Sequence, residues 1–212
     1  YVADYKALHQ DESPRAAFYQ KMGRDFNAGL RFYLCEKRGP IFNYFVDIDM
    51  CATKVASEQE VLEILLIVQE AVSKFYPDLV NPPPRASENW ESRGTAIALY
   101  CDEPTPVISQ RRSFVKTGIH YIFPGLFVNE EQATTITYYI IQTLMRVRPR
   151  TNDMATWASI VDTGVYGNGK GLRMLGSSKC TKCTKCKRMG NWQACLQCSG
   201  TGLTLTGDGR VY

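Results

Sequence analysis

The sequence predicts an α+β fold in which helices pack against a mostly antiparallel sheet. Strand-like and helix-like stretches are both present, but they do not follow the regular β-α-β alternation that is typical of parallel sheets. The chain has 212 residues, of which 44% are hydrophobic and 22% charged, so it is long and apolar enough to bury a core. We expect one sizeable domain followed by a small module.

The first elements are predicted by capping residues and by apolar runs. Ser13 and Pro14 are typical of the N-cap and the first position of a helix. Residues 30–35 and 41–47 are rich in aromatic and branched residues, which predicts two strands of a hairpin.

Two longer helices have clear start signals. Ser57 with Glu60, and Asn129 with Gln132, have the spacing of capping boxes. The first helix then carries a stripe made of Val61, Leu65, Val68 and Val72. The second is expected to face the core with Ile136, Ile140, Ile141, Leu144 and Met145. Both patterns have the period of an amphipathic helix.

The remaining chain predicts short strands separated by loops. Residues 95–101 and 114–123 are strand candidates, and two further extended stretches are expected at 160–162 and 172–175. Residues 81–94, which include three consecutive prolines, are expected to form a loop.

Two aspartates share one face of the predicted strand that ends near residue 47. Asp47 and Asp49 are two residues apart, so a strand places their side chains side by side, with Val46, Ile48 and Met50 behind them. Adjacent carboxylates repel each other unless a cation lies between them, and Mg²⁺ and Mn²⁺ prefer oxygen ligands. The motif therefore indicates metal-dependent phosphoryl or nucleotidyl transfer. The alternative is a pair of strand-end aspartates that face water.

A histidine and a lysine share the face of a later strand. Lys116, Gly118 and His120 alternate, and the glycine leaves room for a triphosphate between the two longer side chains. The alternative is a histidine with a structural role.

Asp162 begins a glycine-rich stretch that invites a mistaken interpretation. Gly164 to Lys170 matches most of a P-loop, but Gly171 stands where Ser or Thr is required, and no helix pattern follows. We reject the P-loop and expect the glycines to form a tight connection that returns Arg173 toward Asp162.

Five of the eight cysteines fall close together near the end of the sequence, which favours zinc and a reducing, intracellular compartment over disulfides. Two C-x₂-C pairs form a tetrahedral ligand set, namely Cys183, Cys186, Cys195 and Cys198. Cys180 is a spare or alternative ligand, and a thioredoxin-like redox role is disfavoured because two pairs occur together. The interleaved basic residues could contact template DNA; they are Lys179, Lys182, Lys185, Lys187 and Arg188. A second basic group, which could neutralise phosphates or simply be solvated, is Arg146, Arg148 and Arg150.

The order of these motifs resembles the archaeo-eukaryotic primase superfamily. A strand-borne D-x-D is followed by a strand with small-x-His, then by h-h-D and an L-R-M-x-G-S-S-K segment. The similarity is strongest to the primase-polymerase type, and to the primase domains of primase-helicases from large nucleocytoplasmic DNA viruses. It covers roughly residues 30–180. It implies a primase-type catalytic core with an RRM-like palm.

The resemblance also implies a role for each matching residue. Three acids would bind two catalytic Mg²⁺ or Mn²⁺ ions: Asp47, Asp49 and Asp162. Four residues would bind the incoming nucleotide: His120, Lys116, Arg173 and Lys179. The chain departs from the family pattern at Gly118, where Ser is usual, and at Gly171, where some relatives have Asn. Some relatives also carry D-x-E in place of D-x-D.

These expectations define a function and two alternatives. The resemblance implies a DNA primase or primase-polymerase that uses NTP or dNTP on a single-stranded DNA template, with a fused or associated replicative helicase. We expect a catalytic core over residues 1–178 and a zinc module over 179–212. No apolar run is long enough for a membrane span, so we expect no membrane partner, and a viral protein of this kind would act in the host cytoplasm at replication sites. The alternatives are a non-catalytic zinc-containing DNA-binding module of a replication complex and a two-metal nuclease.

Overall fold

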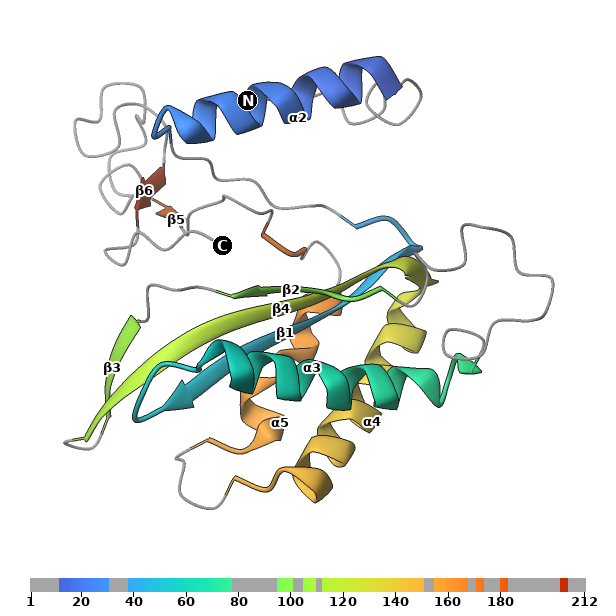
Figure 1. Cartoon of the computed structure of the whole chain (residues 1–212), viewed down its shortest axis with the longest axis vertical. Coiled ribbons are helices and arrows are strands. Elements are labelled where there is room, and N and C mark those ends of the chain that lie inside the picture. Colours follow the sequence, from blue (N-terminus) through green and yellow to red (C-terminus); the bar gives the residue numbers. More distant parts are fainter. Residues whose placement is uncertain are drawn as a thin grey trace. The chain divides into compact units, whose positions relative to one another are not determined.

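The structure is a computed structural model, and it describes residues 12–30, 38–77, 95–100, 105–109, 112–150, 155–167, 171–173, 180–182 and 203–205 (Figure 1). The chain divides into two compact units. One comprises Tyr1–Leu34 with Met174–Val211, and the other contains Cys35–Arg173. The boundary at residue 178 that we expect between core and zinc module remains a prediction.

The first unit contains one helix and a small ladder. Helix α2 spans Glu12–Asn27, so it begins one residue before Ser13, which was expected to be the N-cap. Pro14 is still accommodated, because the first-turn N–H groups of a helix have no acceptor inside it. Strands β5 (Cys180–Lys182) and β6 (Leu203–Leu205) pair antiparallel.

The second unit is built around one long strand. β4 (Arg112–Val128) pairs with β1 (Phe42–Ala52) along one edge, and with β3 (Thr105–Ser109) and β2 (Ile97–Tyr100) along the other. Every pairing is antiparallel, which confirms the predicted α+β class. The register of β1 and β4 shifts at Asn43/Tyr44, where β4 contains Pro124 and Gly125.

Helices α3 (Glu58–Ser73) and α4 (Glu130–Val147) complete the core. Both begin with the predicted capping boxes, and their apolar stripes are buried together with the β1 residues behind the aspartates. The one wrong assignment is Met145, which is 45% exposed because the buried stripe of α4 ends at Leu144. Among the described helices, none has the length and apolarity needed to cross a bilayer.

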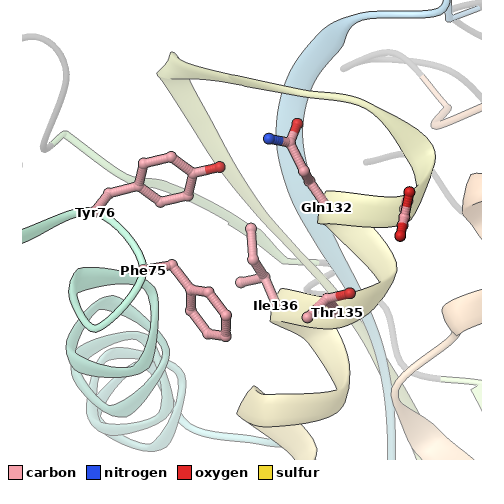
Figure 2. A pocket seen from close by; sticks show the side chains of 6 residues that line it. Phe75, Tyr76, Gln132, Thr135 and Ile136 are labelled. Carbon is pink, nitrogen blue, oxygen red and sulfur yellow. The ribbon is translucent and has the colours of Figure 1, made fainter.

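A hollow of about 350 Å³ lies between the end of α3 and the start of α4 (Figure 2). Its lining residues are Phe75, Tyr76, Glu131, Gln132, Thr135 and Ile136. These residues belong to the helical layer, whereas the predicted site residues belong to β1, β4 and the chain after α5.

Two strand predictions were imprecise or wrong, and one strand was missed. β1 continues to Ala52, so the aspartates lie inside the strand and not at its end, because β4 is long enough to pair with all of it. β3 was missed: it contains Pro106, which a strand tolerates at a sheet edge. The stretch 160–162 is not a strand, since helix α5 (Trp157–Ile160) ends there and Val161 makes a single bridge to Ile48. The expected strand at 30–35 and loop at 81–94 fall outside the described residues, apart from Leu30.

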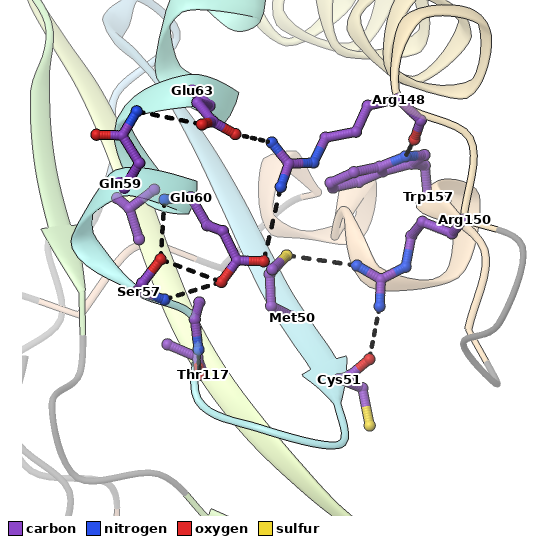
Figure 3. Close-up of polar contacts among 12 residues, drawn as sticks. Met50, Cys51, Ser57, Gln59, Glu60, Glu63, Thr117, Arg148, Arg150 and Trp157 are labelled. Carbon is purple, nitrogen blue, oxygen red and sulfur yellow. Dashed lines mark hydrogen bonds and ion pairs between the residues drawn. The ribbon is translucent and has the colours of Figure 1, made fainter.

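The arginines after α4 bind protein groups. Arg148 donates to Glu63 at 2.7 Å and lies 3.6 Å from Glu60 on α3. Arg150 donates to the carbonyl of Cys51 at 2.6 Å, and its guanidinium lies 5.2 Å from the ring centroid of Trp157 (Figure 3). For these two arginines, the idea of a phosphate-neutralising surface is therefore replaced by a structural role, Arg148 against α3 and Arg150 at the end of β1.

Loss of the Arg150 contacts should be measurable as a loss of stability. Arg150→Ala is expected to lower the free energy of unfolding by about 2 kcal/mol, because losing the charged donor leaves two part-buried carbonyls, those of Cys51 and Ala155, without this partner. Arg146→Ala is the matched control: this residue is exposed in the last turn of α4, and its change should cost less than about 1 kcal/mol. Urea unfolding of both variants gives the comparison, and equal losses would contradict the structural role.

Candidate active site

The register of β1 and β4 brings the predicted residues together. Asp47 lies opposite His120 and Asp49 lies opposite Gly118, while Lys116 is two pairs further along, opposite Cys51. Asp47 Oδ1 is 3.5 Å from His120 Nε2, and Lys116 Nζ is 2.5 Å from Asp49 Oδ2. Lys116 contacts Asp49 diagonally across the two strands, because Gly118, which is opposite Asp49, has no side chain. The alternation predicted for both strands is therefore correct.

Asp162 joins this group through its backbone. Its N–H donates to the carbonyl of Asp47 at 2.9 Å, next to the bridge between Val161 and Ile48. Its carboxylate then accepts from the N–H of Gly164 at 2.8 Å and caps the short 3₁₀ helix η3 (Thr163–Tyr166). The third acid, 113 residues or more from the other two in sequence, thus lies beside them in space.

Burial and the two neighbouring acids raise the proton affinity of Asp47. The pKa of Asp47 rises from 3.8 to about 7, first because the carboxyl is buried and then because Asp49 and Asp162 are close. Arg173 and Lys116 oppose this rise. Asp47 Oδ1 is also buried, and within the described part of the chain it has no hydrogen-bond partner. A buried carboxylate of this kind is poorly compensated by protein groups alone.

His120 is neutral at physiological pH. Burial, followed by the positive charge of Arg173, lowers its pKa to about 4. The neutral imidazole can donate a hydrogen bond, and its expected role in nucleotide binding remains a prediction. Lys116 and Arg173 are the cations of the described site: the first pairs with Asp49, and the second acts on both Asp47 and His120.

The donor set suits a hard divalent cation, although the side chains are turned toward protein partners. Among the residues that the structure describes, no three His, Cys, Asp or Glu side chains form a ready-made metal cluster. Asp49 contacts Lys116, and Asp162 contacts Gly164. A cation bound here would replace Lys116 as the partner of the Asp49 carboxylate and would be coordinated by the buried Oδ1 of Asp47. Carboxylate oxygens are the ligands that Mg²⁺ and Mn²⁺ prefer.

Several expected ligands lie outside the described residues. These are Lys179 and the four cysteines of the predicted zinc set. Cys180 and Lys182 are described only as backbone of β5. The zinc site therefore remains a prediction.

A group of buried residues beside the site was not predicted from the sequence. A chain of buried hydroxyls connects Tyr44, Thr137 and Tyr166, and Tyr166 donates to the carbonyl of Phe45 at 2.5 Å. The side chains lie on β1, α4 and η3, and nothing in their local sequence indicates that they meet.

Comparison with known proteins agrees with this arrangement. A family described as the C962R protein N-terminal AEP domain matches residues 3–188, which is most of the chain. The chain therefore belongs to this family, the N-terminal archaeo-eukaryotic primase domain of C962R-type viral primase-helicases. No curated protein matches the sequence. Membership indicates primase-type nucleotidyl transfer in replication, and archaeo-eukaryotic primases generally use divalent metals.

Proposed function

We propose that this chain synthesises primers on single-stranded DNA by joining NTP or dNTP in a two-metal reaction. The observation that carries the proposal is the convergence of Asp47, Asp49 and Asp162 opposite His120 and Lys116. Three carboxylates, with the Lys116 ammonium and the neutral His120 imidazole opposite them, provide what a triphosphate and its metal ions require. The family match supports the same reaction class.

Each side chain has a role that its surroundings support. Asp47, Asp49 and Asp162 hold two divalent ions, which when bound lower the pKa of the attacking hydroxyl and neutralise the leaving pyrophosphate. Neutral His120 donates a hydrogen bond to a phosphate oxygen. Lys116 turns from Asp49 to the triphosphate.

The other cations and the cysteines complete the proposal. Arg173 adds a positive charge near Asp47, and Lys179 a further phosphate contact. Structural Zn²⁺ is held by Cys183, Cys186, Cys195 and Cys198. We place the domain in a larger primase-helicase, in line with the name of the family.

Incubation with an unprimed single-stranded template, labelled NTP or dNTP, and Mn²⁺ or Mg²⁺ tests the function. We expect new strands that depend on both template and metal. Binding without synthesis would favour the DNA-binding module, and shortened template would favour the nuclease. Comparing NTP with dNTP in the same assay identifies the preferred substrate.

A further inference from the structure

The buried hydroxyls of Tyr44, Thr137 and Tyr166 form one directed chain. The Thr137 oxygen is 2.8 Å from each tyrosine oxygen, and all three side chains are at most 1% exposed. Tyr166 must donate to the carbonyl of Phe45, because a carbonyl only accepts. Thr137 therefore donates to Tyr166, and Tyr44 donates to Thr137. Each hydroxyl hydrogen is used once.

These hydrogen-bonded hydroxyls attach η3 to β1 at a second point. Asp162, at the start of η3, donates its N–H to the carbonyl of Asp47, and Tyr166, at the end, donates its hydroxyl to the carbonyl of Phe45. The two carbonyls are two residues apart on the same strand, so they point from the same edge. A short 3₁₀ helix held at both ends has little freedom to rotate, and the Asp162 carboxylate caps this helix.

The aromatic ring of Tyr166 packs independently of its hydroxyl. It lies 5.3 Å from the ring of Phe45 and 6.2 Å from that of Phe42, measured between centroids. Removing only the hydroxyl should keep η3 packed while releasing its tie to the strand.

We propose that Tyr166 is a positioning residue, whose hydroxyl holds η3 so that Asp162 meets Asp47 at the metal site. The inference rests on the proposed function, since it assigns the residue that keeps the third acid in place. Tyr166 itself touches neither metal nor nucleotide.

The test compares two variants that each lose one buried hydroxyl. Tyr166→Phe removes the tie to Phe45, whereas Tyr44→Phe removes the far end of the chain and leaves that tie intact. Mn²⁺ binding is measured without nucleotide, by the paramagnetic signal of free Mn²⁺. We expect Tyr166→Phe to weaken binding roughly 10-fold, as loss of a group that orients a metal ligand does, and Tyr44→Phe to change it less than about 3-fold. Hydrogen exchange over residues 161–167 should be faster in Tyr166→Phe alone.

A double-variant cycle shows whether the effect passes through Asp162. Added to Asp162→Asn, the Tyr166→Phe change should have no further effect on Mn²⁺ affinity. If Tyr166→Phe binds Mn²⁺ as tightly as wild type, or if Tyr44→Phe loses as much Mn²⁺ affinity as Tyr166→Phe, the inference is wrong. Neither result would contradict the proposed function. Protein that binds Mn²⁺ through Asp162 and Tyr166 but makes no strand would support the positioning role and refute the proposed function. Equal Mn²⁺ binding by wild type and Asp162→Asn would overturn both.

Discussion

Asp47→Asn is expected to reduce primer synthesis at least about 100-fold. Even groups that only orient a metal ligand contribute 10–100-fold to affinity or activity, and Asp47 is proposed to touch the ions directly. Asp47 lies at the centre of the acid group. Asp49 is two residues away on the same face of β1, the N–H of Asp162 donates a hydrogen bond to the Asp47 carbonyl, and His120 lies opposite on β4. Asparagine keeps the size of the side chain and removes only the charge. The measurement is the rate of strand synthesis on an unprimed template.

Cys51→Ser is the matched control for this change. Cys51 lies on the same face of β1, two residues beyond Asp49, and its carbonyl contact with Arg150 does not involve the side chain. We expect its activity to stay within about 2-fold of wild type, because serine preserves size and leaves the three acids intact. Near-normal synthesis by folded Asp47→Asn would rule out the metal assignment.

Local patterns in the sequence predicted much of the fold. The capping boxes at Ser57 and Asn129 satisfy helix N–H groups with side chains three residues away, so the signal is contained in a short stretch. The strand alternation at Asp47 and His120 is equally local. β1 was predicted too short because its length depends on pairing with β4, which begins sixty residues after β1 ends.

The site was predicted in part for the same reason. The motif order grouped the acids with Lys116, His120 and Arg173, but the hydrogen bond that brings Asp162 to Asp47 is a long-range contact with no local signature. The Tyr166 chain and the Arg150 contacts are of this kind as well. The low pKa of His120 depends on burial and on Arg173, so a short motif could not reveal that the imidazole is neutral.

The second large effect concerns stability against pH. In the folded chain the pKa of Asp47 is about 7, compared with 3.8 when unfolded, so the folded state binds the extra proton between these values. Asp47 therefore makes wild type less stable as pH rises from about 4 to about 7. His120 acts in the opposite sense: its pKa is about 4 when folded and 6.5 when unfolded, so stability falls as pH drops from 6.5 to about 4. In wild type the two trends offset each other over much of this range.

Asp47→Asn should separate the two contributions. We expect it to match wild type near pH 4 and to become more stable as pH rises, by on the order of 4 kcal/mol at pH 8, where wild type holds a buried charge. Asp49→Asn is the comparison, since this carboxylate is more exposed and paired with Lys116. Its loss removes only the repulsion that it adds at Asp47, so a smaller gain in stability is expected. Urea unfolding at several pH values gives these differences. A constant difference between Asp47→Asn and wild type from pH 4 to pH 8 would contradict the burial argument.

Divalent ions should narrow the difference in stability between wild type and Asp47→Asn at pH 8. A cation that binds only the folded chain stabilises it, and here it would also compensate the buried charge of Asp47. Excess Mn²⁺ is therefore expected to raise the melting temperature of wild type and to leave that of Asp47→Asn nearly unchanged, narrowing the gap between them. An equal rise in both proteins would mean that the ions bind elsewhere. In that case, metal binding would not explain why the folded chain keeps the destabilising charge of Asp47.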